Sequence, residues 1–301
     1  MKSGFIGIIG RPNVGKSTLL NAILGEKISI TTDKPQTTRN SIRGIYTHRA
    51  ENENQEDVQM IFIDTPGIHK PKNKLGSYMT GMAINTFKEV EVIILIVDDE
   101  LSAGTGDRYI LDLLEGIDTP KILVINKIDK LDPDKYRRIY EEYNALGMFH
   151  AIFGASALEG KNVDVILKEV ESLLGEGPMY FPEDMVTDHP ERFIVSEIIR
   201  EKTLMYLDKE VPHGIAIEIE SYKESDTLTK IGVVIHCEKK SHKGIIIGKE
   251  GKKLKGIGKS SRMEIEALLG TKVFLELWVK VKENWRDSDF ALSNFGYDNK
   301  E

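Results

Sequence analysis

The first half of the chain alternates short apolar runs with longer amphipathic stretches. Residues 92–97 and 121–125 are almost continuously apolar, which is typical of parallel strands buried on both faces. This alternation predicts an α/β domain built on a mostly parallel sheet with helices on both faces. We expect strands over residues 4–10, 41–48, 58–64, 91–98, 120–126 and 149–154, and helices over residues 16–24, 77–88, 105–116, 133–145 and 160–174.

The second half follows a different pattern. An amphipathic helix is expected from residue 191 to about 207. Two strands, 214–222 and 230–238, then alternate apolar and polar residues, as in a sheet with one face open to water. An apolar segment, 244–247, turns into a basic helix, and residues 272–281 form a closing strand. These elements predict a smaller α+β domain.

Glycine, proline and acidic residues are concentrated between Gly175 and Pro190, a composition typical of a linker. The length of 301 residues suits two domains, each with its own core. The predicted organisation is a first domain over residues 1–175, a linker over 176–190, a second domain over 191–286 and a C-terminal tail over 287–301.

Charge is distributed unevenly. The formal net charge of −7 argues against a protein that binds nucleic acid over its whole surface. Residues 239–262, however, contain nine lysine or arginine residues and a single acid, Glu250, which gives a local balance of +8. Cys237 is the only cysteine, so an intrachain disulfide is excluded, and we expect a reducing, cytoplasmic environment. No apolar run is long enough to span a bilayer.

The residues after the first predicted strand fit the pattern G-x-x-x-x-G-K-[ST], from Gly10 to Ser17. Between a strand and a helix, this pattern turns successive backbone N–H groups inward and forms a cradle for phosphate. Glycine at positions 10 and 15 allows close approach of the backbone, Lys16 is expected to reach the β- and γ-phosphates, and the Ser17 hydroxyl is placed for Mg²⁺. The alternative is a glycine-rich turn that binds nothing.

Two further segments are expected beside this loop. Residues 30–39 form a threonine-rich loop, in which one hydroxyl can complete a Mg²⁺ shell when a γ-phosphate draws the loop in. An ordinary surface loop is the alternative. Asp64 ends the third predicted strand and begins a D-x-x-G sequence that closes at Gly67. The Asp64 carboxylate can hold Mg²⁺, commonly through water, and the Gly67 amide can bond a γ-phosphate.

The fifth predicted strand ends on N-K-x-D, from Asn126 to Asp129. The Asp129 carboxylate can accept hydrogen bonds from the ring N–H and the amino group of guanine, whereas adenine offers no such pair of donors. Asn126 can brace the pocket, and the Lys127 stem can lie along the base. After the sixth strand, Ser156 and Ala157 supply small side chains and an amide, that of Ala157, for the guanine carbonyl. These motifs at the ends of strands predict a guanine-nucleotide site.

Ile68 follows the D-x-x-G glycine, where many GTPases carry a glutamine that orients the attacking water. We therefore expect slow intrinsic hydrolysis and a different group that positions the water. The residues expected to bind the nucleotide are Gly10, Arg11, Pro12, Asn13, Val14, Gly15, Lys16, Ser17, Thr18, Asp64, Thr65, Pro66, Gly67, Ile68, Asn126, Lys127, Asp129, Ser156 and Ala157.

The second domain contains a G-x-x-G sequence, from Gly248 to Gly251, that leads into a basic helix. Two glycines let a nucleic-acid backbone approach closely, and lysines supply phosphate contacts, as in K-homology domains, which clamp about four single-stranded nucleotides. The local positive charge favours this interpretation over a simple turn. The residues expected to bind RNA are Lys243, Gly248, Lys249, Glu250, Gly251, Lys252, Lys253 and Lys255.

Several other residues have two interpretations. Trp278 and Trp285 can stack on bases, but large aromatic residues near the end of a strand more often belong to a core. The seven histidines show no spacing typical of metal ligands, and His242, beside Lys243, is expected on the basic face.

The sequences G-R-P-N-V-G-K-S, Q-T-T-R, D-T-P-G, N-K-I-D and S-A, with K-G-I-I-I-G-K-E-G and K-V-F-L-E-L-W-V-K-V, together resemble the Era family. These are bacterial ribosome-assembly GTPases of the TrmE-Era-like group. The resemblance covers nearly the whole chain and implies a P-loop GTPase domain followed by an α+β K-homology domain of type II. It also implies a GTP-hydrolysing switch that binds the 3′ end of small-subunit 16S rRNA during 30S maturation and leaves after hydrolysis.

The resemblance further implies roles for single residues and partners. Thr38 rather than Thr37 is the expected Mg²⁺ ligand, and Asn13 is a candidate ligand for an activating K⁺ that offsets the missing glutamine. The family is also described at the cell membrane, so peripheral association of a cytoplasmic monomer with its inner face is expected. The implied metal ligands are Ser17, Thr38 and Asp64, and the implied catalytic residues are Lys16, Thr38, Gly67 and Asn13.

Two departures from the family pattern leave the motifs intact. Residues 51–57 form an acidic insertion that is expected to lengthen a hairpin, and residues 98–100 are unusually acidic.

Two other functions fit part of the sequence. The second domain can be a protein-binding or membrane-peripheral module, which a salt titration distinguishes because phosphate contacts make RNA binding salt-dependent. The phosphate loop can also belong to a metabolic nucleotide kinase or transferase. The N-K-x-D sequence argues against that alternative, and phosphoryl transfer to water alone would exclude it.

Overall fold

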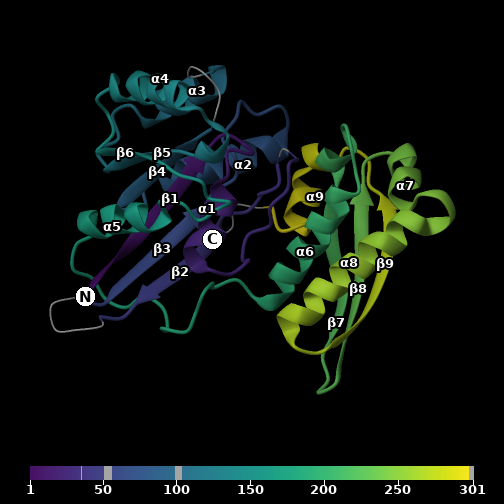
Figure 1. Ribbon diagram of the computed structural model, residues 1–301. Coiled ribbons are helices and arrows are strands. Elements are labelled where there is room, and N and C mark those ends of the chain that lie inside the picture. Colours follow the sequence, from purple (N-terminus) through teal and green to yellow (C-terminus); the bar gives the residue numbers. More distant parts are fainter. Residues whose placement is uncertain (35, 51–55, 99–103, 298–301) are drawn as a thin grey trace. The chain divides into compact units, whose positions relative to one another are not determined.

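The computed structural model describes residues 1–34, 36–50, 56–98 and 104–297. The chain forms two compact units (Figure 1). The first contains Met1–Thr31, Thr38–Lys72 and Gly76–Asp188, and the second contains Thr32–Thr37, Asn73–Leu75 and His189–Glu301. Most of the expected acidic insertion, residues 51–55, and two of the three acidic residues 98–100 lie outside the described residues.

The sheet of the first unit has the strand order β2-β3-β1-β4-β5-β6. All neighbouring strands run parallel except β2, which is antiparallel to β3. The expected α/β class and its mostly parallel sheet are confirmed. The strands are β1 (Lys2–Gly10), β2 (Ile42–His48), β3 (Val58–Asp64), β4 (Val92–Val97), β5 (Lys121–Ile125) and β6 (Ala151–Gly154), and the helices are α1 (Lys16–Leu24), α2 (Lys74–Thr86), α3 (Thr105–Leu114), α4 (Pro133–Asn144) and α5 (Val163–Leu173).

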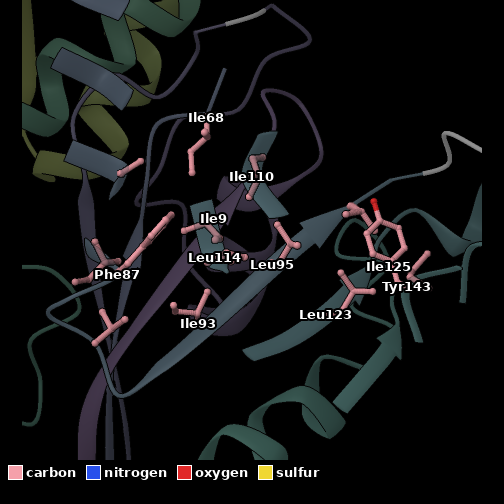
Figure 2. Close-up of a cluster of buried hydrophobic side chains, with 14 of the residues drawn as sticks. Ile9, Ile68, Phe87, Ile93, Leu95, Ile110, Leu114, Leu123, Ile125 and Tyr143 are labelled. Atoms are coloured by element: carbon pink, nitrogen blue, oxygen red, sulfur yellow. The ribbon is translucent and has the colours of Figure 1, made fainter. Parts of the chain in front are cut away.

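The core of this unit explains why its central strands are apolar throughout. Alternate residues of β4 point to opposite faces, and all six are buried. Ile93 and Leu95 join one hydrophobic cluster with residues such as Phe87 and Ile110 from the flanking segments (Figure 2). A strand with helices over both faces has no side that can tolerate polar residues.

The predicted linker is bound to the first unit along much of its length. Gln59 Oε1, on β3, accepts hydrogen bonds from the backbone N–H groups of Tyr180 and Phe181, at 2.8 and 3.0 Å. The Ile45 N–H donates to the Val186 carbonyl at 2.9 Å. The Gln59 side chain is fully buried, so it needs these partners, and residues 176–188 follow the sheet as an ordered strap.

The second unit is an α+β structure around a sheet in the order β7-β8-β9. β8 pairs antiparallel with β7 and parallel with β9. One buried cluster contains Ile235, Cys237, Ile246, Ile257 and Val279. The elements are α6 (Glu191–Met205), β7 (Ala216–Lys223), β8 (Leu228–Cys237), α7 (Lys240–Ile247), α8 (Lys252–Leu269), β9 (Lys272–Val281) and α9 (Asp289–Asn294).

Two local features of this unit differ from what the sequence pattern indicated. The predicted element order has no helix before the G-x-x-G turn, but residues 244–247 are the end of α7, and Ile246 packs into the core. β8 is buried along nearly its whole length instead of facing water on one side. The Phe295 ring lies over His236, with ring centroids 4.8 Å apart, and covers part of that face. No helix among the described residues is long and apolar enough to cross a membrane.

Candidate functional site

The loop between β1 and α1 has the backbone shape that its glycines permit. Gly15 has a φ of 106°, and a Cβ there would lie 2.1 Å from Asn126 Nδ2. Gly10 has a φ of 152°, and a Cβ there would lie 2.5 Å from the carbonyl oxygen of Ile96. Both positions therefore require glycine, because a side chain would collide with the neighbouring strand ends. The loop opens at the N-terminus of α1, where backbone N–H groups favour an anion.

Lys16 is buried within this loop. Its ammonium group donates to the carbonyl oxygens of Gly10 and Arg11, at 3.2 and 2.7 Å. Burial lowers the pKa of Lys16 to about 8, although the Asp64 carboxylate acts in the opposite direction. The loop therefore holds a cation beside the α1 N-terminus, where phosphate oxygens can replace the carbonyl acceptors.

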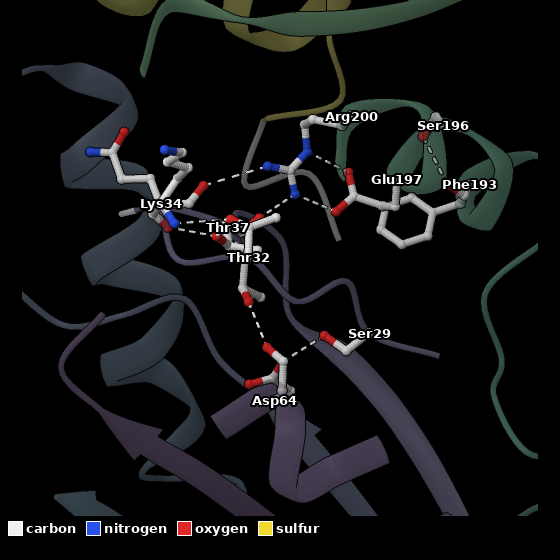
Figure 3. A network of polar contacts seen from close by, with 12 residues as sticks. Ser29, Thr32, Lys34, Thr37, Asp64, Phe193, Ser196, Glu197 and Arg200 are labelled. Atoms are coloured by element: carbon white, nitrogen blue, oxygen red, sulfur yellow. Dashed lines mark hydrogen bonds and ion pairs between the residues drawn. The ribbon is translucent and has the colours of Figure 1, made fainter. Parts of the chain in front are cut away.

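The three expected metal ligands lie together. Ser17 Oγ donates to Asp64 Oδ2 at 2.6 Å and lies 2.9 Å from Thr38 Oγ1. Ser29 Oγ, which the sequence did not single out, also donates to Asp64 Oδ2, at 2.8 Å (Figure 3). Asp64 is fully buried, burial raises its pKa, and Oδ1 accepts no hydrogen bond from the described residues. Mg²⁺ prefers oxygen ligands, so a buried carboxylate with hydroxyl groups beside it, and with one oxygen that accepts no hydrogen bond from the described residues, fits this ion.

Asn126 links two of the predicted motifs. Its Nδ2 donates to the Val14 carbonyl at 2.8 Å, and its Oδ1 accepts from the Ala157 N–H at 3.0 Å. The Ala157 amide, which is expected to bond a guanine carbonyl, donates to Asn126 Oδ1 in this structure without nucleotide. Because Asn126 is buried, these two bonds fix the phosphate loop relative to the loop after β6.

Asp129, the residue expected to select guanine, is hydrogen-bonded to Ser156 of the loop after β6. The Ser156 hydroxyl donates to Asp129 Oδ1 at 2.6 Å. This hydrogen bond lowers the pKa of Asp129, so the carboxylate stays ionised at neutral pH. An ionised carboxylate with a second oxygen available can accept from the donor edge of guanine.

Asp98 was missed as a functional residue, although it lies at the end of β4. Its Oδ1 accepts from Arg11 Nη2 at 2.9 Å, and its Oδ2 pairs with Lys127 Nζ at 3.1 Å. Lys127 Nζ also donates to the Asn13 carbonyl at 2.9 Å, and Arg11 Nε pairs with Asp107 at 2.8 Å. Asp98 therefore joins the phosphate loop to the N-K-x-D loop. Its position directly after a buried strand was the only available signal.

The D-x-x-G segment divides into residues that face the site and residues that support it. A Cβ on Gly67 would lie 2.6 Å from the Pro12 backbone nitrogen, so Gly67 lies against the phosphate loop. Thr65 Oγ1 donates to the Ile8 carbonyl at 2.8 Å, and the Ile68 N–H donates to the Gly10 carbonyl at 3.0 Å. The Ile68 side chain belongs to the hydrophobic cluster of Figure 2. These hydrogen bonds and the burial of Ile68 show that Thr65 and Ile68 support the fold, and their expected contact with the nucleotide stays a prediction.

The G-x-x-G turn of the second unit joins α7 to α8. Gly248 has a φ of 71° and Gly251 a φ of 71°, and Glu250 between them is also left-handed, at 54°. A Cβ on Gly248 would lie 2.9 Å from Lys253 Cβ, whereas a Cβ on Gly251 would meet no atom within 4 Å. The turn therefore presents an open backbone at Gly251.

Lysine side chains surround this turn. Lys243, Lys249, Lys252 and Lys255 are exposed, and Lys253 Nζ donates to the Tyr206 carbonyl at 3.1 Å. The structure thus brings the predicted RNA-binding residues to one turn and the flanking helices. A positively charged turn with accessible backbone is suited to a phosphodiester chain.

The two tryptophans and His242 differ in their exposure to solvent. Trp285 is fully buried and its Nε1 donates to the Gly214 carbonyl at 2.9 Å, so it is a core residue. Trp278 is 46% exposed on β9 and can offer a ring face to a base. His242 is buried, which corrects its expected place on the basic face. On α7 it lies on the side that packs inward with Ile246.

Two protein families match parts of the chain. Residues 5–127 match the family described as 50S ribosome-binding GTPase, and residues 210–286 match the KH domain family. The two matches fall on the unit with the phosphate loop and on the unit with the G-x-x-G turn.

Relatives match over nearly the whole length. The chain is 58% identical to GTPase Era of Alkaliphilus oremlandii, over 99% of both chains. It is 54% identical to GTPase Era of Clostridioides difficile, again over 99% of both. A crystal structure of Era with MgGDPNP and nucleotides 1506–1542 of 16S ribosomal RNA superimposes with a TM-score of 0.92, at 41% identity over 99% of both chains. An Aquifex aeolicus Era variant bound to GDP and aluminium fluoride gives a TM-score of 0.93 at 41% identity. The expectation from the sequence motifs is confirmed: the chain belongs to the Era family of GTPases.

Proposed function

We propose that this protein is a GTP-hydrolysing switch whose nucleotide state controls its hold on the 3′ end of 16S rRNA, and that it assists 30S maturation and leaves after hydrolysis. The observation that carries the nucleotide part is the pair of hydrogen bonds in which Asn126 donates to the Val14 carbonyl and accepts from the Ala157 N–H. These bonds bring a phosphate cradle and a guanine-selective carboxylate to one edge of the sheet. The RNA part is supported by the 41% identical Era whose structure contains 16S nucleotides.

In the proposed site, the phosphate-loop amides and Lys16 bind the phosphates, and Asp129 selects guanine. Lys127 lies along the base, because Asp98 and the Asn13 carbonyl hold its ammonium group. The proposed nucleotide-binding residues are Gly10, Arg11, Pro12, Asn13, Val14, Gly15, Lys16, Ser17, Thr18, Asp64, Thr65, Pro66, Gly67, Ile68, Asn126, Lys127, Asp129, Ser156 and Ala157.

Ser17, Thr38 and Asp64 are proposed to hold Mg²⁺. Their oxygen atoms already lie within hydrogen-bond distance of one another, and Asp64 Oδ1 is open for a further contact. When bound, the ion would neutralise charge on the phosphate oxygens.

Hydrolysis is proposed to rest on charge stabilisation rather than on a water-orienting side chain. Lys16 carries positive charge to the γ-phosphate, the Gly67 N–H donates to it, and Thr38 closes the loop over it. Ile68 cannot orient water, because its side chain lies in the core. Asn13 is exposed in the phosphate loop, and we propose it as a ligand for an activating K⁺.

The proposed functional division follows the predicted organisation. Residues 1–175 form the GTPase domain, 176–190 the connecting segment, 191–286 the K-homology domain and 287–301 the tail. We propose that the protein acts as a cytoplasmic monomer that can also associate peripherally with the inner face of the cell membrane.

Gly251→Asp tests the RNA part with little disturbance of the fold. A Cβ at Gly251 meets no atom within 4 Å, and Asp tolerates the left-handed conformation better than most residues. The added charge should weaken binding of a 16S 3′-end oligonucleotide by at least about tenfold, because it faces the phosphate chain. Hydrolysis of GTP without RNA should stay within about twofold, because the phosphate loop belongs to the other compact unit.

Gly270→Asp is the matched control. Gly270 has a similar φ of 66° and equally open surroundings, but it lies at the other end of α8. RNA affinity should be close to that of the unchanged protein. If Gly251→Asp and Gly270→Asp bind the oligonucleotide equally well, the G-x-x-G turn is not the RNA site.

A further inference from the structure

An aspartate at the end of β4 pairs with cations from two loops. Asp98 directly follows β4, and its side chain is 14% exposed. Its Oδ1 accepts from Arg11 Nη2, in the phosphate loop, at 2.9 Å. Its Oδ2 accepts from Lys127 Nζ, in the N-K-x-D loop, at 3.1 Å. These three residues all belong to the first unit, so the contacts lie within one compact body.

The sheet places Asp98 beside the N-K-x-D loop. Val97 and Ile125 are partners in the parallel register of β4 and β5. The Asn126 N–H donates to the Val97 carbonyl at 2.8 Å. Asp98 follows Val97 and Lys127 follows Asn126, so the two side chains leave the sheet at neighbouring strand ends. The backbone pairing thus explains how the carboxylate reaches the ammonium group.

The Lys127 ammonium group connects two backbone positions of unusual conformation. Its Nζ donates to the Asn13 carbonyl at 2.9 Å. Asn13 has a φ of 66° and Lys127 a φ of 62°, which is uncommon for residues other than glycine. Such conformations persist where surrounding contacts hold them. Lys127 directly precedes the 3₁₀ turn Ile128–Lys130, so its conformation sets the start of the turn that carries Asp129.

The ion pairs make Lys127 more dependent on Asp98 than Arg11 is. Arg11 has a second carboxylate partner, because its Nε pairs with the buried Asp107 at 2.8 Å. Among the described residues, Asp98 is the one carboxylate that pairs with Lys127. If Asp98 lost its charge, Arg11 would keep an ion pair, whereas Lys127 would keep the neutral Asn13 carbonyl. The Lys127 ammonium group would then be held less firmly, because a charged acceptor bonds an ammonium group more strongly than a neutral one.

We propose that Asp98 is a positioning residue for guanine-nucleotide binding: it holds the Lys127 ammonium group and, through it, the Asn13 peptide, so that the base loop and the phosphate loop are set together. This inference rests on the proposed nucleotide-binding roles of these loops. Asp98 acts through Lys127 and contacts neither the proposed metal ligands nor Lys16. It therefore serves GDP and GTP equally and contributes to binding rather than to the hydrolytic step.

The test compares the full-length protein with Asp98→Asn. Asparagine has nearly the same volume as aspartate but no negative charge, so Lys127 loses its carboxylate partner. The Kd values for fluorescent GDP and for a fluorescent non-hydrolysable GTP analogue should both rise by about tenfold, and their ratio should stay within about twofold. The KM for GTP should rise by a similar factor, while kcat should stay within about twofold.

Asp57→Asn is the matched control. Asp57 also pairs with an arginine of the first unit, because its Oδ2 accepts from Arg49 Nη1 at 2.5 Å. It directly precedes β3, whose other end carries Asp64, so it lies at the opposite end of the sheet from the phosphate loop. Both Kd values should stay within about twofold of those of the unchanged protein.

A double-mutant cycle identifies the group through which Asp98 acts. Lys127→Met removes the ammonium group and keeps an apolar stem of similar length. In that background, Asp98→Asn should change the Kd for GDP by less than about threefold, because the group that it positions is already absent. Asp98→Ser is a second way to remove the charge, and in the unchanged background it should raise the Kd for GDP as Asp98→Asn does.

The outcomes separate this inference from the proposed function. A Kd for GDP within about twofold of the unchanged protein in both Asp98 variants would overturn the positioning role. A loss of about tenfold that persists beside Lys127→Met would also overturn it, because Asp98 would then act through another group. Loss of secondary structure in both Asp98 variants by circular dichroism would overturn it as well, because Asp98 would then serve only stability. If the unchanged protein binds GDP but fails to hydrolyse GTP, the proposed function fails, whereas the GDP affinities still decide the role of Asp98.

Discussion

The phosphate-loop lysine is expected to make the nucleotide-free protein less stable, which Lys16→Met tests. In the empty loop, burial lowers the Lys16 pKa from 10.5 to about 8. At about 1.4 kcal/mol for each pH unit, this corresponds to a cost of about 3 kcal/mol for keeping the ammonium charged at pH 7. The substitution also removes the hydrogen bonds to the Gly10 and Arg11 carbonyls, and their loss offsets part of the stability gained by removing the buried charge. The net gain for Lys16→Met is therefore expected to be about 1–2 kcal/mol.

The pH dependence follows from the same shift. The folded protein has the lower lysine pKa, so the unfolded chain binds more protons between pH 8 and pH 10.5. The cost is complete below about pH 8 and fades as the pH rises toward 10.5. The stability advantage of Lys16→Met should accordingly be largest at pH 7 and should nearly vanish at about pH 10.

Urea unfolding of the nucleotide-free protein measures the stability of the compact unit that contains Lys16. The two tryptophans, Trp278 and Trp285, lie in the second unit, whereas Lys16 lies in the first. The far-ultraviolet circular dichroism transition should shift to higher urea, and a separate tryptophan fluorescence transition should stay unchanged. With GDP at about 100 times its Kd, the unchanged protein should gain about 2.7 kcal/mol and the variant very little. A variant that is less stable than the unchanged protein at pH 7 without nucleotide would refute the reasoning.

Three other substitutions have defined outcomes. Asp129→Asn should weaken GTP binding by about 100-fold or more, because the carboxylate that accepts from guanine is lost. Xanthosine triphosphate should then bind better than GTP in a competition assay. An unchanged preference for GTP would contradict the base assignment. Gly67→Ala places a Cβ 2.6 Å from the Pro12 backbone nitrogen, so the two segments must move apart. The kcat should therefore fall by about tenfold or more in a phosphate-release assay. A normal kcat would show that hydrolysis does not depend on this close contact. Trp285→Phe removes a buried ring segment and the hydrogen bond to Gly214. The free energy of unfolding of the second unit should therefore fall by about 2–3 kcal/mol in urea unfolding followed by Trp278 fluorescence. An unchanged free energy of unfolding would show that Trp285 is not a core residue.

The sequence predicted the parts of the fold whose patterns are local. The strands at 58–64 and 92–97 end within a residue of their predicted limits, because an apolar strand between helices leaves little choice of boundary. Ser17 and Asp64 were singled out because their motifs follow strand ends, whereas Thr38 was chosen over Thr37 only through the family resemblance. The structure brings the three side chains together, and their role as metal ligands stays a proposal.

The contacts that sequence reasoning missed join distant residues. Asp98 is separated from Arg11 by 87 positions and Arg200 from Thr37 by 163, and neither pair belongs to a shared motif. The strap at 176–188 looked like a linker, because its partners, such as Gln59 on β3 and Ile45 on β2, lie more than 100 positions away in the sequence. Such pairings depend on the folded path of the chain, so the residue types alone do not reveal them.

The central claim is that the nucleotide state sets the affinity for ribosomal RNA. The most direct measurement is the Kd of the full-length protein for a fluorescent single-stranded oligonucleotide with the sequence of the 16S 3′ end, at one fixed salt concentration, with a non-hydrolysable GTP analogue and with GDP. The account predicts binding at least about tenfold tighter with the GTP analogue. Equal Kd values in the two nucleotide states would contradict it.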